Sequence, residues 1–168
     1  LAACAAVAGR VFDFNVVCRA AGMDEETALD GIDELLLRGF LREGTGASGR
    51  DYEFVHALMR QVVYEGLHHR RRRRLHRLIG EALETLAPTP RAESSGILAH
   101  HFDRAEVRDK ALEYAEQAAR HAWNLGATNE TVQYYGLALR CLEHIGAMAY
   151  GERAYRERRF DLLLGCEQ

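Results

Sequence analysis

The feature that most constrains the fold is a glycine-rich loop followed by a short extended segment that runs directly into a helical pattern. The loop occupies residues 44–49, and residues 52–55 have strand character before His56 opens the next helix. Residues 40–43 also have strand character, and an acidic amphipathic helix precedes them. This order predicts a winged-helix domain in which a two-stranded hairpin over residues 40–55 is the only β structure.

Helical patterns fill most of the remaining sequence, so we expect a mainly α fold. Residues 1–8 and 14–21 predict short helices, the second of which ends at Gly22. A third helix begins after Asp24, a favoured N-cap residue. The long helical pattern that follows His56 is interrupted near residues 66–70.

The second half of the chain has the pattern of antiparallel helical repeats. Small and aromatic residues line consecutive helices at Ala115, Ala119, Ala122, Tyr135 and Ala138, as in tetratricopeptide repeats. The predicted domains are a winged-helix domain at 1–68, a basic linking helix at 69–90 and truncated tetratricopeptide-like repeats at 91–168.

Composition favours a reduced, cytoplasmic setting. The net charge of −3 gives no global attraction to nucleic acid or to an anionic membrane. The cysteines are scattered without a C-x-x-C pair, which is typical of reduced core thiols. The apolar start is too short to span a bilayer, and no basic segment precedes it. The chain lacks an initiator methionine, and we expect it to be a fragment of a longer protein.

No motif in the sequence predicts catalysis or a bound cofactor. Gly44, Gly46 and Gly49 satisfy G-x-G-x-x-G, but a strand-like segment follows them where a dinucleotide site needs a helix, so we interpret them as a flexible wing. A P-loop sequence is missing, and the histidines do not have metal-ligand spacing. We therefore expect neither enzyme activity nor a metal site in this chain.

A run of arginines is the strongest local charge feature. It comprises Arg70, Arg71, Arg72, Arg73 and Arg74. Contact with DNA is one interpretation, and docking against acidic protein surface is the other. Winged-helix readers insert their third helix into the major groove, and here that helix carries six acids over residues 24–34 against Arg38. Repulsion from phosphates disfavours specific DNA binding, so we expect the arginines to dock protein.

The chain resembles bacterial STAND-class signal-transduction ATPases, in which an ATPase domain precedes a tetratricopeptide array, often fused to a cyclase or a LuxR-type domain. The resemblance rests on these segments: Gly9-Arg10-Val11-Phe12, Leu35-Leu36-Leu37-Arg38-Gly39-Phe40-Leu41, Phe54-Val55-His56-Ala57-Leu58-Met59-Arg60, Arg72-Arg73-Arg74-Leu75-His76 and Ala99-His100-His101-Phe102. It covers essentially the whole chain.

The resemblance implies a regulatory role for this chain. In that class the winged-helix domain holds the upstream ATPase core in its diphosphate-bound form, and a histidine at a strand-to-helix junction reaches the nucleotide phosphate. His56 occupies the matching position, while Val55 and Ala57 differ from the Met and Asp that flank the family's histidine. ATP and ADP are thereby implied for the parent protein, and a protein partner or inducer for the repeats. A DNA-binding regulator and a helical-repeat scaffold are the alternatives.

Overall fold

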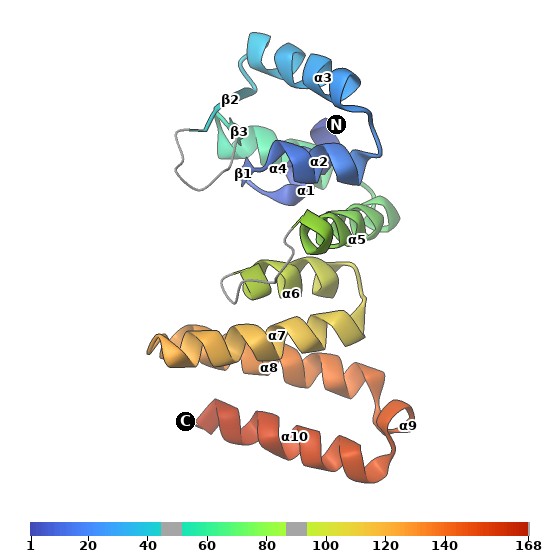
Figure 1. Cartoon of the computed structure of the whole chain (residues 1–168), viewed down its shortest axis with the longest axis vertical. Coiled ribbons are helices and arrows are strands. Elements are labelled where there is room, and N and C mark those ends of the chain that lie inside the picture. Colours follow the sequence, from blue (N-terminus) through green and yellow to red (C-terminus); the bar gives the residue numbers. More distant parts are fainter. Residues whose placement is uncertain (45–51, 87–93, 168) are drawn as a thin grey trace. The chain divides into compact units, whose positions relative to one another are not determined.

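The structure is a computed structural model that describes residues 1–44, 52–86 and 94–167, without the side chains at 147, 148, 166 and 167 (Figure 1). The chain divides into two compact units, Leu1–Leu86 (unit 1) and Ala87–Gln168 (unit 2). The described residues are mainly helical with a small three-stranded antiparallel sheet, so the predicted fold class is confirmed at that level.

Unit 1 contains five helices and the three strands among its described residues. In chain order they are α1 (Ala2–Ala8), β1 (Val11–Phe12), α2 (Phe14–Ala21), α3 (Glu25–Leu37), β2 (Leu41–Glu43), β3 (Tyr52–Phe54), α4 (Ala57–Glu65) and α5 (His69–Leu86).

Local signals account for the first helix boundaries. The Asp13 carboxylate accepts a hydrogen bond from the Val16 N–H at 3.2 Å and caps α2, which ends at Gly22 with a left-handed φ of 64°. Asp24 caps α3 as predicted, accepting bonds from the N–H and the hydroxyl of Thr27 at 2.9 and 2.8 Å. These bonds lower the pKa of the Asp24 carboxyl, the backbone bond contributing most.

The sheet has a strand that the sequence did not predict. Its order is β1–β3–β2 with both pairings antiparallel, and Val11 faces Glu53 while Leu41 faces Phe54. The prediction that residues 40–55 hold the only β structure is therefore wrong. Two residues between helices show no alternating pattern, and β1 exists because it pairs with β3 far along the chain. The hairpin tip at 45–51 lies outside the described residues.

Helix α5 belongs to the core of unit 1. It packs against α1 and α2, and its side chains at Leu75, Ile79 and Ala82 are buried in the same cluster as Phe12 and Phe54. The sequence predicted residues 69–90 as a linking segment outside a domain at 1–68, whereas the division into compact units groups α5 with unit 1. Residues 87–90 lie outside the described part of the chain.

Unit 2 is helical throughout its described residues. Its helices are α6 (Ser95–Arg104), α7 (Arg108–Asn124), α8 (Thr128–Ile145), α9 (Ala147–Tyr150) and α10 (Glu152–Glu167). Helices α6, α7 and α8 pack successively against one another, and α10 lies along α8 (Figure 1).

Small side chains set the close contacts of unit 2. Ala115 and Ala119 of α7 and Ala138 of α8 are fully buried, and these two helices pack against each other. Between α8 and α10 a Cβ at Gly165 would lie 2.5 Å from the ring of Tyr135, so this approach requires glycine. Thr131 is buried and donates its hydroxyl to the Ala127 carbonyl at 3.0 Å, which satisfies the polar group inside the core.

Candidate functional site

The predicted phosphate-sensing residue, His56, lies at the junction between β3 and α4. Its backbone is extended at φ −123° and ψ 133°, and it is the N-cap of α4 without a side-chain capping bond. The side chain is exposed. The structure therefore places His56 where the sequence predicted it and leaves its ring accessible to a partner.

Two large apolar side chains of α4 are exposed as well. Leu58 is 71% exposed and Val62 is 70% exposed, one helical turn apart. On the opposite face Met59, Val63 and Tyr64 pack against the core of unit 1. Helix α4 therefore begins at an accessible imidazole, and on another side it exposes apolar surface of a kind typical of contact surfaces.

A polar cluster fixes the buried side of α4. The Arg60 guanidinium donates to the Ala6 carbonyl in α1 at 3.0 Å. The Tyr64 hydroxyl lies 3.0 Å from Nε2 of the buried His76 in α5. The Arg72 guanidinium stands over the Tyr64 ring, 5.4 Å from its centroid. These contacts join α4, which begins directly after His56, to α1 and α5. The sequence did not predict the contact between Tyr64 and His76, although both residues lie on the apolar faces of their helices.

The five consecutive arginines of α5 do not form one surface. Successive helix positions are about 100° apart, so the run divides among several faces. Arg72 packs against Tyr64 and its Nε is buried without a hydrogen-bond partner. Arg73 is half-buried and already has a polar contact. Arg70, Arg71 and Arg74 are exposed. The predicted docking set therefore reduces to these three side chains as the accessible ones.

Arg70, Arg71 and Arg74 border a pocket of about 530 Å³ between α1, α2 and α5. His68, which precedes α5, lies at the same border, and its Nδ1 accepts a hydrogen bond from the Arg71 N–H at 3.3 Å. Cys4 lies in the apolar wall, where burial raises the pKa of its thiol and the positive charges of the N-terminus and Arg71 oppose that rise. Sequence spacing gave no sign of this pocket, because three separate helices form it.

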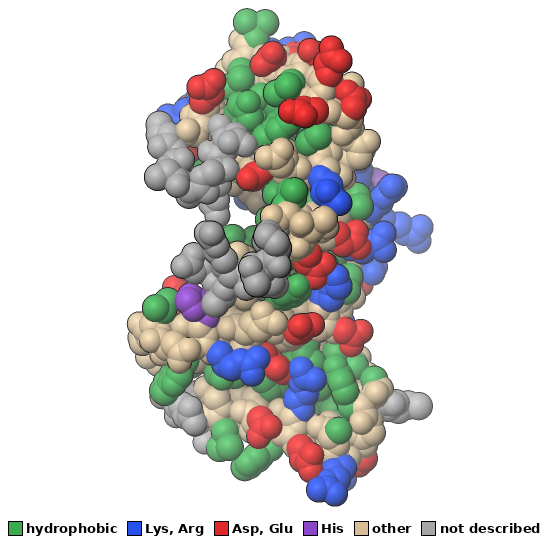
Figure 2. Space-filling model, viewed as in Figure 1, with side chains coloured by type: hydrophobic (Ala, Val, Ile, Leu, Met, Phe, Trp, Pro, Cys, Tyr) green, Lys and Arg blue, Asp and Glu red, His purple; other side chains and the backbone are tan. Residues whose placement is uncertain are grey.

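The acidic residues of α3 are exposed, as the sequence argument against major-groove binding requires. Glu25, Glu26, Asp30, Asp33 and Glu34 all face solvent, and Figure 2 shows acidic side chains gathered over this helix. Arg38 pairs with Glu34 at 2.7 Å and offsets one of them. A phosphate backbone laid along α3 would meet this negative surface.

We therefore expect the chain to bind duplex DNA only weakly, through phosphate contacts of exposed arginines. Its affinity should fall by about one log unit per log unit of salt for each phosphate neutralised, because binding releases counterions. Fluorescence anisotropy with two unrelated duplexes across a salt series measures this directly. Nanomolar binding that distinguishes the two duplexes at physiological salt would contradict the expectation and support a DNA-binding regulator.

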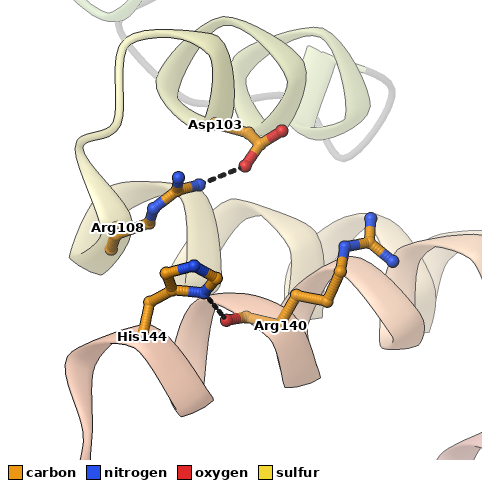
Figure 3. Close-up of polar contacts among 4 residues, drawn as sticks. All are labelled: Asp103, Arg108, Arg140 and His144. Atoms are coloured by element: carbon orange, nitrogen blue, oxygen red, sulfur yellow. Dashed lines mark hydrogen bonds and ion pairs between the residues drawn. The ribbon is translucent and has the colours of Figure 1, made fainter.

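Unit 2 contains a polar cluster where α6, α7 and α8 meet (Figure 3). The Arg108 guanidinium donates to the Asp103 carboxylate at 2.5 Å, and His144 donates from Nδ1 to the Arg140 carbonyl at 2.7 Å. Cys141 is fully buried, and burial raises the pKa of its thiol. A buried, protonated thiol is a poor nucleophile, so this cluster serves to tie the helices together.

A second pocket, of about 300 Å³, lies between α7, α8 and α10. Glu116 and Arg158 form an ion pair across it at 2.8 Å, and the hydrogen bond that the Arg158 guanidinium donates to the Glu116 carboxylate raises the pKa of Arg158. The lining also contains Arg120 and Asp161, so basic and acidic side chains are balanced in this pocket, unlike in the arginine-bordered pocket of unit 1.

Two searches within the described residues gave negative findings. No group of three or more histidine, cysteine, aspartate or glutamate side chains there could hold a metal ion. Within the same residues no helix is both long enough and apolar enough to cross a membrane. The glycines at positions 46 and 49 of the G-x-G-x-x-G sequence lie outside the described part of the chain.

Comparison with family models, with curated proteins and with solved structures found no match to this chain.

Proposed function

We propose that this chain is a non-catalytic regulatory segment of a STAND-type signalling ATPase. Unit 1 would be the winged-helix domain that restrains the nucleotide-binding core, and unit 2 would be a tetratricopeptide-like arm that binds a partner or inducer. ATP and ADP would be ligands of the upstream ATPase domain, and the proposal carries with it a cytoplasmic location.

The topology of unit 1 supports the winged-helix assignment. Its elements follow the order α1–β1–α2–α3–β2–β3, and the strands lie in the order β1–β3–β2. Winged-helix domains have this element order, with a short first strand pairing beside the hairpin. The additional strand therefore favours the proposal more than the two-stranded sheet expected from the sequence.

The observation that carries the proposal is the exposure of His56 at the start of α4. The backbone N–H groups of a helix start attract anions, and Leu58 and Val62 on another side of α4 are exposed among the described residues. A neighbouring ATPase domain that packs against the start of α4 would bring its bound nucleotide toward the histidine. Arg70, Arg71 and Arg74 offer guanidinium groups for acidic residues of a neighbouring domain.

Unit 2 has features that suit a partner-binding arm. The buried alanines at 115, 119 and 138 permit the close helix packing of tetratricopeptide repeats. At the turn between α7 and α8, Trp123, Leu125 and Val132 remain exposed. Tryptophan is enriched among the residues that dominate binding energy at protein interfaces, so we propose that a partner binds unit 2 near Trp123.

The decisive experiment replaces His56 in the full-length parent protein. We expect His56→Ala to speed diphosphate release about 10- to 100-fold and to raise basal signalling, because a hydrogen bond to a charged phosphate contributes about 1.5–3 kcal/mol. Stopped-flow release of a fluorescent ADP analogue measures the rate. Fold retention is checked by circular dichroism of the isolated chain.

His144→Ala, which changes an exposed histidine of unit 2, is the matched control and should leave release unchanged. If His56→Ala unfolds the isolated chain, or if diphosphate release in the parent stays at the wild-type rate, His56 is structural and the nucleotide role fails.

A further inference from the structure

The pocket between α1, α2 and α5 has two chemically distinct parts. Its wall is apolar and comprises Leu1, Ala3, Cys4, Ala20, Ala21, Met23, Leu75 and Leu78. Its border is basic and comprises Arg70, Arg71 and Arg74, together with His68. A volume of about 530 Å³ falls within the range of small-molecule sites, which is about 300–1,000 Å³.

The positive charge at the border is not neutralised within the described residues. No carboxylate lines the pocket, and the three exposed arginines form no ion pair with a described residue. Helix geometry explains the grouping, since positions 70, 71, 74, 75 and 78 fall on one flank of α5. That flank therefore presents guanidinium groups at its start and leucines one or two turns later.

The His68 ring adds an oriented polar group to the border. Because its Nδ1 accepts the Arg71 N–H, the neutral ring carries its proton on Nε2 and has an N–H to donate. Arg71 in turn lies close enough to the wall for its charge to act on the Cys4 thiol. Cationic and apolar groups thus converge on one concave site formed by three helices.

We propose that this pocket binds a small anion with an apolar body, of the class of an alkyl carboxylate. The guanidinium forks match the two oxygens of a carboxylate, and the alkyl chain lies along the wall formed by α1, α2 and the leucines of α5. A small anion without an apolar body would leave the apolar wall in contact with water, and a neutral hydrocarbon would leave the arginines without a charged partner. A ligand that has both groups therefore fits the pocket better than either. This binding goes beyond the proposed regulatory function and is independent of the role of His56, but it uses the same three arginines that the proposed function assigns to an acidic neighbouring domain.

The test uses the whole chain and decanoate as the probe, at concentrations below its micelle threshold. Isothermal calorimetry measures affinity, and ¹H–¹⁵N correlation spectra locate the site. We expect saturable one-to-one binding with shift changes centred on Cys4, Ala20, Ala21 and Met23. Acetate, which lacks the apolar body, and 1-decanol, which lacks the charge, should each bind at least about tenfold more weakly.

Two arginine variants give the matched comparison. Arg71→Gln/Arg74→Gln removes two border charges and should weaken decanoate binding about 10- to 100-fold, since each hydrogen bond to a charged group contributes about tenfold. Arg77→Gln removes an exposed arginine of the same helix that does not line the pocket, and it should bind decanoate like the wild type. If the double variant loses its circular dichroism, Arg74→Gln alone replaces it.

Several outcomes would overturn the proposal. The proposal is wrong if decanoate does not saturate a single site, if acetate or 1-decanol binds as tightly as decanoate, or if Arg77→Gln weakens decanoate binding as much as the double variant. An acidic peptide that perturbs the same residues and binds more tightly than decanoate would assign the pocket to a protein segment instead.

Discussion

A fragment of residues 1–86 should unfold in a single cooperative transition, whereas a fragment that ends at residue 68 should not fold. The reason is that α5 completes the core of unit 1, with Leu75, Ile79 and Ala82 buried against α1 and α2. Burial of a leucine or isoleucine contributes about 1.5–3 kcal/mol each, and the whole stability of a domain is about 5–15 kcal/mol. Removing α5 therefore removes a large share of the total.

Urea denaturation followed by far-UV circular dichroism checks this expectation. The shorter fragment would also lose the contact of Tyr64 with His76 and leave the apolar sides of α1 and α2 in water. Within the 1–86 fragment, Ile79→Ala should lower the free energy of unfolding by about 2–5 kcal/mol, and Arg77→Gln should change it by less than about 0.5 kcal/mol. Cooperative folding of the 1–68 fragment would restore the domain boundary predicted from the sequence.

The elements that the sequence predicted correctly are those with local signals. Asp24 caps α3, Gly22 ends α2, and the break near residues 66–70 falls between the end of α4 at Glu65 and the start of α5 at His69. Each signal depends on hydrogen bonds or backbone preferences within a few residues, so the local sequence is enough to determine where the helix begins or ends.

The elements that the sequence did not predict depend on distant partners. Strand β1 has two residues, and its extended conformation is fixed by Tyr52 and Glu53 across the sheet. The apolar face of α5 was visible in the sequence, but the pattern does not say that α1 and α2 cover it. A periodic pattern predicts that a face is buried and gives no information about what it is buried against.

The candidate sites divide in the same way. The position of His56 follows from the strand-to-helix junction, which is local, whereas its contact with nucleotide stays a prediction because it needs another domain. The grouping of Arg71 with Cys4 and Ala20 requires three helices to meet, and no spacing rule finds it. The five arginines are consecutive in the sequence and were therefore predicted to form one patch. In the helix, successive residues lie on different faces, and Arg72 packs against Tyr64.

Phe102→Ala should destabilise unit 2 by about 3–5 kcal/mol, a large fraction of the stability of a domain. Phe102 is fully buried in α6 and stacks on the Tyr114 ring of α7, with centroids 5.7 Å apart and planes 10° from parallel. The Lys110 ammonium lies 4.8 Å above the Phe102 ring. Truncation to alanine leaves a cavity between α6 and α7 and removes both ring contacts. The loss of stability should therefore exceed the free energy gained by burying a phenylalanine side chain away from water.

The chain supplies its own reporter for this prediction. Trp123 is the single tryptophan of the sequence and lies in α7, so its fluorescence follows unit 2 while circular dichroism follows both units. Phe160→Ala is the matched control, because that phenylalanine is 61% exposed on α10 and its loss should change stability by less than about 0.5 kcal/mol. The Trp123 transition should move to lower urea in Phe102→Ala alone, with the unit 1 transition unchanged. Equal shifts in the two variants would mean that Phe102 is not part of a close-packed core, and the packing of α6 on α7 would then be wrong.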